Sequence, residues 1–133
     1  MLAGVADTHT ALWWEYADSR LSLRARAFLE LADIESLEIG ISVVSLAEIV
    51  YLVEKGRIRP TAFEDIQRAI ADPDHVFEAL PVTVEIAAAM RRIPREAVPD
   101  FPDRIIAATA LERGVPVLTR DGKIRLSDVD TIW

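Results

Sequence analysis

Short apolar runs alternate along this chain with longer stretches in which apolar residues recur every three or four positions. Short runs rich in β-branched residues are typical of buried strands, and the longer spacing is typical of helices with one buried face. The runs predict strands at residues 2–6, 37–44, 76–82, 115–118 and 129–133. The spacing predicts helices at residues 8–16, 22–32, 45–55, 61–71, 85–92 and 102–113. Because strands and helices alternate, we expect an α/β fold with a parallel sheet covered on both faces.

The clearest unit of this pattern lies between Pro99 and Asp121. Pro102 suits the first turn of a helix, because its missing N–H has no partner there, and Gly114 is a typical helix end. The strand at 115–118 then runs antiparallel to the helix. Asp103 at the start of the helix and Asp121 just past the strand should therefore meet at one edge of the sheet.

Two further acids should reach the same edge. Asp7 directly follows the first predicted strand, and Glu48 lies in the first predicted turn after the second strand. In open parallel sheets, ligands bind outside the carboxyl ends of the strands. We therefore expect Asp7, Glu48, Asp103 and Asp121 to converge on one site, although they are far apart in the sequence.

Each of these acids also has a structural interpretation. Asp7 can cap the first helix, and Ser45 and Glu48 fit the S-x-x-E capping box. Asp103 can complement a helix dipole, and Asp121 followed by glycine is a common turn signal. The conjunction of all four favours a metal site, because clustered carboxylates repel one another unless a cation compensates them.

Carboxylate oxygens in this number suit Mg²⁺ or Mn²⁺. A metal held in this way on an open edge can activate water and neutralise a phosphodiester during its hydrolysis. We therefore expect a divalent cation cofactor, Mg²⁺ or Mn²⁺.

Composition narrows the function classes. The chain has 133 residues, 51% of them hydrophobic and 28% charged, which fits one globular domain over residues 1–133. It has no cysteine, which excludes disulfides and thiolate chemistry and fits a cytoplasmic location. The N-terminal segment lacks signal-peptide features, and no apolar run reaches membrane-spanning length. A net charge of −7 argues against a broad basic surface for nucleic acid.

Four segments resemble the PIN domain, and within it the VapC-type toxins of bacterial toxin–antitoxin pairs. In chain order they are VADTHTALWW, ISVVSLAEIVYLVEKGRI, PDFPDRIIAATALERGVPVLTRD and DTIW. The similarity spans the whole chain, and the four acids named above stand at the acidic positions of the family.

The resemblance implies a Rossmann-like parallel sheet of five strands in the order 3-2-1-4-5. It also implies a Mg²⁺-dependent endoribonuclease toxin that cleaves RNA, is inhibited by a cognate VapB-like antitoxin, and commonly forms a homodimer. Asp7 and Asp103 would be the main metal ligands, with Glu48 and Asp121 completing the site. Asp100 stands where many relatives carry an acid, and a helix cap is an equal interpretation.

Two other classes remain. A response-regulator receiver is also α/β, but it needs a phosphoacceptor Asp after the third strand, where this chain has Thr83. A metal-binding interaction module with a PIN or receiver-like fold and no turnover is the second alternative.

Other conspicuous residues carry weaker indications. His9 lies two positions after Asp7 and is interpreted as a surface group, and His75 is interpreted as part of a loop. Four arginines near the expected site fit phosphate binding and an ordinary solvated face equally well: Arg91, Arg92, Arg95 and Arg104. The same two interpretations apply to Arg57 and Arg59. Five aromatic residues exceed what a small core readily hides and predict an apolar groove for a protein partner among the first four helices: Trp13, Trp14, Phe28, Tyr51 and Phe63.

Overall fold

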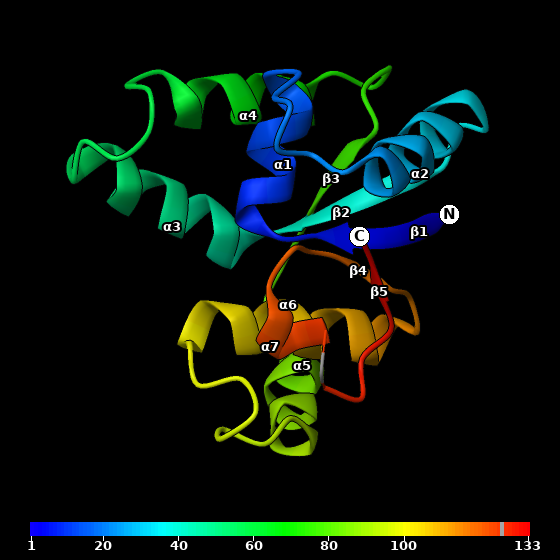
Figure 1. Ribbon diagram of the computed structural model, residues 1–133, viewed down its shortest axis with the longest axis vertical. Helices are drawn as coiled ribbons and strands as arrows, with labels where there is room; N and C mark the ends of the chain where they lie inside the picture. Colours follow the sequence, from blue (N-terminus) through cyan, green and yellow to red (C-terminus); the bar gives the residue numbers. More distant parts are fainter. Residues whose placement is uncertain (126) are drawn as a thin grey trace.

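Five parallel strands form the centre of the computed structural model, which describes residues 1–125 and 127–133 (Figure 1). The strands are β1 (Leu2–Ala6), β2 (Glu38–Ser42), β3 (Phe77–Leu80), β4 (Val117–Leu118) and β5 (Thr131–Ile132). The helices are α1 (Thr8–Glu15), α2 (Leu23–Ile34), α3 (Val43–Glu54), α4 (Ala62–Ala71), α5 (Val84–Ala89), α6 (Phe101–Arg113) and α7 (Gly122–Arg125).

The order of the strands in the sheet is β3-β2-β1-β4-β5, and every neighbouring pair is parallel. This confirms the α/β class, the parallel sheet and the order 3-2-1-4-5. Receiver domains have the order 2-1-3-4-5. The receiver-like alternative is therefore wrong.

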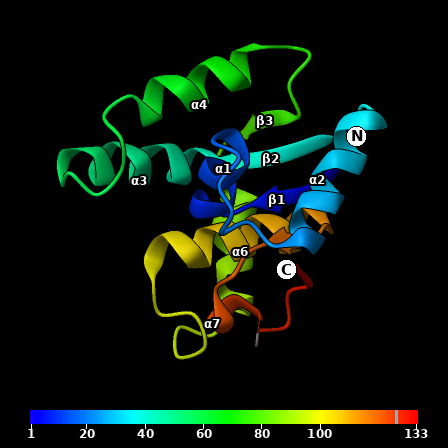
Figure 2. The same ribbon diagram turned by 45° about the horizontal axis from the view of Figure 1, so that its top comes forward.

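The sheet separates two hydrophobic cores, and adjacent residues of one strand contribute to opposite cores. Val5 packs with α5 and α6 on one face, whereas Ala6 packs with α1, α2 and α4 on the other. Val117 and Leu118 divide in the same way. Figures 1 and 2 show α1, α2 and α4 on one side of the sheet and α5, α6 and α7 on the other. The helices on both faces agree with the expected architecture.

The boundary between β2 and α3 differs from the prediction. The strand ends at Ser42, whose hydroxyl accepts a hydrogen bond from the Val44 N–H at 3.2 Å and caps the helix that begins at Val43. The predicted strand 37–44 and the Ser45 capping box are therefore wrong. A serine oxygen that satisfies a free helical N–H outweighs the β-propensity of two valines. Glu48 consequently lies in the second turn of α3, not the first.

The helices of the C-terminal third are also shorter or more numerous than the sequence predicted. The fifth helix ends at Ala89 and is followed by a 3₁₀ turn, Met90–Arg92. Helix α6 spans Phe101–Arg113 and is capped by Gly114, whose φ of 68° is left-handed. The short helix α7 was not predicted. It forms because the Asp121 carboxylate accepts hydrogen bonds from the Lys123 and Ile124 N–H groups at its start.

The aromatic residues that predicted an apolar groove mostly belong to the core beneath α1, α2 and α4. Trp13 is buried, and Trp14, Phe28 and Phe63 pack against the same core. Tyr51 differs, because 53% of it is exposed. These residues therefore do not by themselves form an exposed groove.

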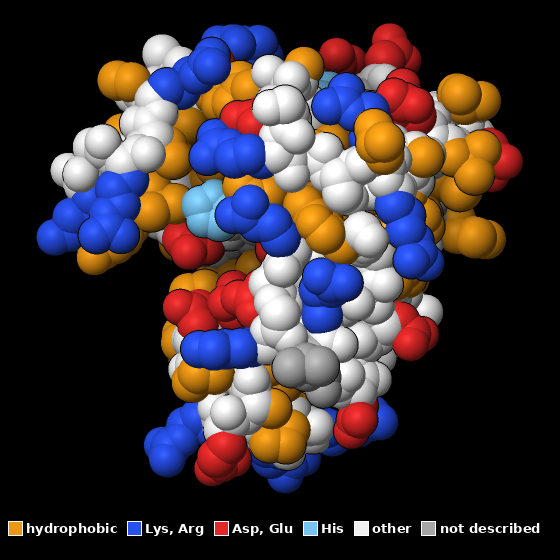
Figure 3. All heavy atoms as spheres, viewed as in Figure 1, with side chains coloured by type: hydrophobic (Ala, Val, Ile, Leu, Met, Phe, Trp, Pro, Cys, Tyr) orange, Lys and Arg blue, Asp and Glu red, His pale blue; other side chains and the backbone are white. Residues whose placement is uncertain are grey.

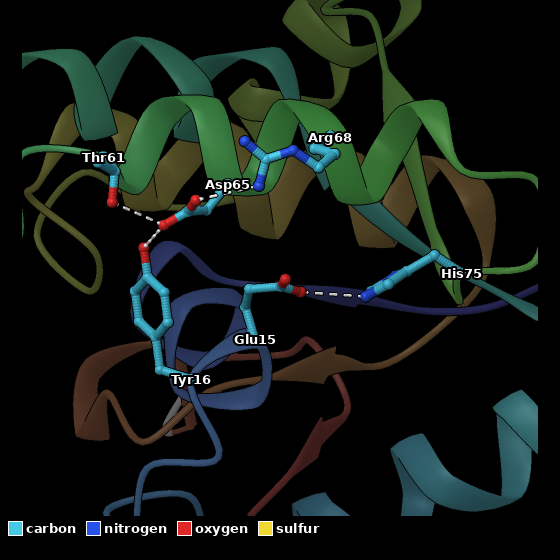
Figure 4. A network of polar contacts seen from close by, with 6 residues as sticks. All are labelled: Glu15, Tyr16, Thr61, Asp65, Arg68 and His75. Atoms are coloured by element: carbon cyan, nitrogen blue, oxygen red, sulfur yellow. Dashed lines mark hydrogen bonds and ion pairs between the residues drawn. The ribbon is translucent and has the colours of Figure 1, made fainter.

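A network of hydrogen bonds connects the end of α1 to α4 (Figure 4). Tyr16 donates a hydrogen bond of 2.6 Å to Asp65, which also accepts one of 2.9 Å from Thr61. Glu15 lies 3.0 Å from His75, in the loop that leads to β3. Because Asp7 caps the start of α1, these contacts help to fix the helix that follows one of the predicted site residues.

None of the helices in the described part of the chain combines the length and apolar character needed to cross a lipid bilayer.

Candidate functional site

Asp7 lies at the carboxyl end of β1 and is 8% exposed. Its Oδ1 accepts a hydrogen bond from the Thr10 N–H at 2.9 Å, so the predicted capping role is confirmed. Its Oδ2 accepts a hydrogen bond of 2.5 Å from the Thr119 hydroxyl. Both carboxylate oxygens therefore have a fixed donor, and the side chain is oriented at the end of the strand.

Thr119 connects Asp7 to Asp121. It is fully buried directly after β4, and its hydroxyl oxygen accepts a hydrogen bond of 2.9 Å from the Asp121 N–H. The same hydroxyl thus donates to one acid and holds the backbone of another. Asp121 follows the strand as predicted, and its carboxylate also caps α7.

Glu48 reaches the same region from α3. Its Oε1 accepts a hydrogen bond of 2.5 Å from the hydroxyl of Thr8, the first residue of α1. This bond joins two helices that follow two neighbouring strands, β1 and β2. A position in the second helical turn therefore still brings Glu48 to the expected edge.

Asp103 lies in the first turn of α6. Asp100 caps this helix, because its carboxylate accepts a hydrogen bond of 3.0 Å from the Asp103 N–H. Burial raises the pKa of Asp103 from 3.8 to about 8, and the charges of Asp100 and Asp121 add to this effect. A hydrogen bond with Asp121 and the charge of Asp7 act in the same direction. Three other acids are thus close enough to resist ionisation of Asp103.

A cavity of about 290 Å³ brings all four predicted site residues together. Its lining includes Asp7, Glu48, Asp103 and Asp121, and also Asp100. Figure 3 shows acidic side chains on both sides of a hollow between the α3 and α6 parts of the molecule, with basic side chains above it. Residues far apart in sequence therefore form one acidic cavity at the carboxyl edge of the sheet.

The donor set of this cavity suits a hard divalent cation, because its acids offer carboxylate oxygens. Burial is the main cause of the raised pKa of Asp103, and the neighbouring carboxylates add negative charge that a cation would relieve. Within residues 1–125 and 127–133, no three Asp, Glu or His side chains are already arranged as a metal-binding group. The residues fit a metal by their chemistry and charge, while the carboxylates of Asp7, Glu48 and Asp121 accept hydrogen bonds from protein donors.

Sequence reasoning missed several residues of the cavity. Thr8, Trp13 and Arg120 also line it. The Arg120 guanidinium lies 4.7 Å from the centre of the Trp13 ring, a cation–π distance. Arg120 directly precedes Asp121 at the end of a strand, and that position was the signal that could have identified it.

His9 lies on the border of this cavity. Its exposed ring stacks on Trp13 with a centroid distance of 5.7 Å and an interplanar angle of 27°. The surface position agrees with the sequence interpretation, and the stacking adds an aromatic face beside the acids.

The four arginines expected near the site do not line the acidic cavity. Arg104 donates hydrogen bonds to the carbonyl oxygens of Met90 and Ile93, at 2.9 and 3.1 Å, so it braces the loop before α6. Arg91 and Arg92 line a separate cavity between α5 and α6. None of these three is among the residues that line the acidic cavity.

Comparison with known proteins agrees with this fold. Residues 5–130 match the PIN domain family. The chain is 31% identical to Ribonuclease VapC22 of Mycobacterium tuberculosis, over 94% of this chain and 92% of that protein. Its fold is similar to that of VapBC2 from Rickettsia felis bound to a promoter DNA fragment, with a TM-score of 0.72, 16% identity, and coverage of 98% of this chain and 97% of that one. It is also similar to DNA-bound VapBC from Salmonella typhimurium, with a TM-score of 0.72, 21% identity and the same coverage.

Proposed function

Because this chain belongs to the PIN domain family, we propose that it is a VapC-type endoribonuclease toxin that uses Mg²⁺ to hydrolyse RNA phosphodiester bonds. In this proposal, residues 1–133 form one PIN domain. The observation that carries the proposal is the single cavity lined by Asp7, Glu48, Asp103 and Asp121 at the carboxyl edge of the sheet. The proposal is also supported by the relative that is 31% identical to this chain, because that relative is named as a ribonuclease.

Each acid has a distinct part in this proposal. Asp7 and Asp103 are the main metal ligands, and Glu48 and Asp121 complete the site and orient water. Asp7 keeps its orientation through Thr10 and Thr119, and Glu48 keeps its orientation through Thr8. When bound, a divalent cation lowers the pKa of the attacking water and neutralises charge on the phosphodiester. Mg²⁺ is the proposed ion, and Mn²⁺ has suitable chemistry as well.

The Arg120 guanidinium supplies positive charge on the wall of the same cavity. Its contact with Trp13 holds the guanidinium on one side of the acids. We assign it to a phosphate oxygen of the RNA, because guanidinium groups bind phosphate through charge-assisted hydrogen bonds.

A cognate VapB-like antitoxin is the proposed protein partner, and the structural neighbours described as VapBC support it. A homodimer and a cytoplasmic location complete the proposal. Co-expression with the product of the adjacent reading frame tests the partner. A stable complex that abolishes cleavage is the expected result, and light scattering of the free chain measures its oligomeric state.

Cleavage of a mixed RNA pool by the purified chain tests the activity. We expect cleavage with Mg²⁺, none with chelator, and a loss of at least ~10²-fold in rate for Asp7→Asn and for Asp103→Asn, by comparison with losses at residues that orient metal ligands. Asp33→Asn is the matched control, because Asp33 is an exposed acid on α2. Cleavage that persists in chelator, or at near-wild-type rate in both site variants, would overturn the metal assignment.

A non-catalytic metal-binding interaction module remains the second candidate. Its basis is the same acidic cavity, because binding a cation there requires the carboxylates but no turnover of RNA. This candidate predicts that Mg²⁺ stabilises the protein against heat without any RNA cleavage. The cleavage assay, combined with thermal melts, therefore separates the two functions.

A further inference from the structure

A second cavity adjoins the acidic one and has the opposite charge. It measures about 370 Å³ and lies between the end of α1, the loop that follows it, and the turn from α3 to α4. The two cavities share His9 and Trp13 in their linings. The basic cavity, as we call it here, is distinguished by its three arginines: Arg20, Arg57 and Arg59.

The arginines of the basic cavity are not equally available. Arg20 makes a two-pronged contact with Asp18, at 2.7 and 3.1 Å, and these hydrogen bonds lower the pKa of Asp18 to about 2. Arg57 and Arg59 are exposed, and neither has an ion-pair partner among the described acids. The free positive charge of the cavity is therefore concentrated on these two residues.

Aromatic rings support the basic cavity. The Arg59 guanidinium lies 3.6 Å from the centre of the Tyr16 ring, and Arg20 lies 5.2 Å from the centre of the Trp13 ring. Tyr16 is itself fixed by its hydrogen bond to Asp65 (Figure 4). Stacking of this kind orients a guanidinium while its N–H groups stay available to a ligand.

In a chain of net charge −7, two free arginines beside an acidic cavity need an explanation. A single-stranded nucleic acid presents a phosphate at every nucleotide, and proteins bind it with basic grooves interleaved with aromatic rings. An RNA strand bound at the acidic cavity must extend beyond that cavity. If it leaves on the side of His9, it first meets the stacked rings of His9 and Trp13 and then the arginines of the basic cavity.

From this juxtaposition we propose that the basic cavity is a subsite for the RNA strand next to the cleaved phosphodiester, with Arg57 and Arg59 binding backbone phosphates. This inference rests on the proposed ribonuclease function and extends it. The exposed face of His9 lies between the two cavities, where the strand passes from one to the other. Phosphate contacts position the strand and carry no base specificity.

Binding of a fluorescein-labelled single-stranded RNA of mixed sequence tests the proposal. The full-length protein is used with Mg²⁺ in the Asp7→Asn background, so that the RNA is not consumed, and again in the wild-type background with chelator. The Arg57→Ala/Arg59→Ala variant should bind on the order of 10-fold more weakly at low salt. The slope of log affinity against log salt should fall by ~1.4, since each phosphate contact to a single strand contributes about 0.7.

Arg91→Ala/Arg92→Ala is the matched control, because it removes the same charge from two exposed arginines at a separate cavity. It should bind RNA as the parent protein does. Thermal melts establish that each variant is folded. Equal losses in both double variants, or no loss in either, overturn the subsite.

A protein segment rich in acidic residues is the other ligand that would fit two arginines. If Arg57→Ala/Arg59→Ala binds RNA normally but no longer forms the antitoxin complex, the cavity belongs to a protein partner and the RNA proposal is wrong. Hydrolysis of bis-p-nitrophenyl phosphate reports separately on the acidic cavity. Failure of the hydrolytic function is therefore distinguished from failure of the subsite.

Discussion

Thr119 and Asp7, which are 112 positions apart in the sequence, are joined by a hydrogen bond of 2.5 Å from the Thr119 hydroxyl to Asp7 Oδ2. The same hydroxyl accepts the Asp121 N–H. One buried side chain thus sets the positions of two acids that come from neighbouring strands, β1 and β4.

The first prediction follows from this bond. Thr119→Val keeps the shape of the side chain but leaves a buried carboxylate oxygen and a backbone N–H without their partner. We expect a loss of about 1–3 kcal/mol in the free energy of unfolding. RNA cleavage should fall by roughly 10- to 100-fold, as for other residues that orient metal ligands.

Thr119→Ser is the control for this prediction, since it retains the hydroxyl. It should stay within a few-fold of the wild-type rate. Denaturant unfolding and the cleavage assay measure the two effects. Equal rates for the Val and Ser variants would show that the hydroxyl does not position the site.

Asp7, Asp103 and Asp121 could be predicted because each stands at a strand end or a helix start, and sheet topology brings those ends together. Glu48 was predicted from a helix start that the structure places one turn earlier, and it still reaches the same cavity.

The sequence did not predict Thr119, since a threonine after a strand is an ordinary β-forming residue and its partner is remote in the sequence. Arg104 shows the converse error. It stands beside Asp103 in the sequence, yet its guanidinium satisfies the carbonyl oxygens of Met90 and Ile93.

The presence of helix α3 was predicted correctly, but its first residue was not. Both Ser42 and Ser45 can cap a helix, and only Ser45 is followed by a glutamate at the capping-box spacing. The structure uses Ser42. Glu48 instead accepts a hydrogen bond from Thr8, a long-range contact that a local rule does not register.

The second prediction concerns His9, whose exposed ring stacks on Trp13 at the border of the acidic cavity. We expect this ring to stack on an RNA base, an interaction worth about 1–3 kcal/mol for each base. His9→Ala should therefore weaken RNA binding on the order of 10-fold, and His9→Phe should restore it. If His9→Phe binds RNA normally but does not cleave it, the imidazole takes part in the chemistry and stacking is not its main role.

The third prediction uses the bond between Tyr16 and Asp65. Burial, together with the hydrogen bond to Asp65 and its charge, raises the pKa of Tyr16 from 10.0 to about 12. Because the folded pKa lies above the unfolded one, the stabilisation is complete below pH 10 and is lost as the pH rises towards 12. Tyr16→Phe should lower the melting temperature by a few degrees at neutral pH, with a flatter profile above pH 10.

Tyr51→Phe is the control, because Tyr51 is 53% exposed on α3. Thermal melts across alkaline pH compare the three proteins. The pairing of Tyr16 with Asp65 is refuted if Tyr16→Phe and Tyr51→Phe follow the same profile as the wild type.

The last prediction turns on the repulsion among the acids. Without metal, burial and the charges of Asp100 and Asp121 raise the pKa of Asp103 to about 8. The unfolded chain ionises this group near 3.8, so in chelator the stability of the wild type should fall as the pH rises from about 4 to about 8. Asp103→Asn lacks this titration. It should be the more stable protein at the upper end of that range, by roughly 1 kcal/mol after screening and lost hydrogen bonds are allowed for.

Added Mg²⁺ should then raise the melting temperature of the wild type by mass action and that of Asp103→Asn much less. A purely structural role predicts the opposite sign in chelator, because removing a negative charge near the start of α6 weakens its interaction with the helix dipole. Thermal melts of both proteins, in chelator and in Mg²⁺ across this pH range, decide between the two. An Asp103→Asn protein that is less stable in chelator, beside a wild type indifferent to Mg²⁺, would assign Asp103 to the helix and remove it from the proposed metal site.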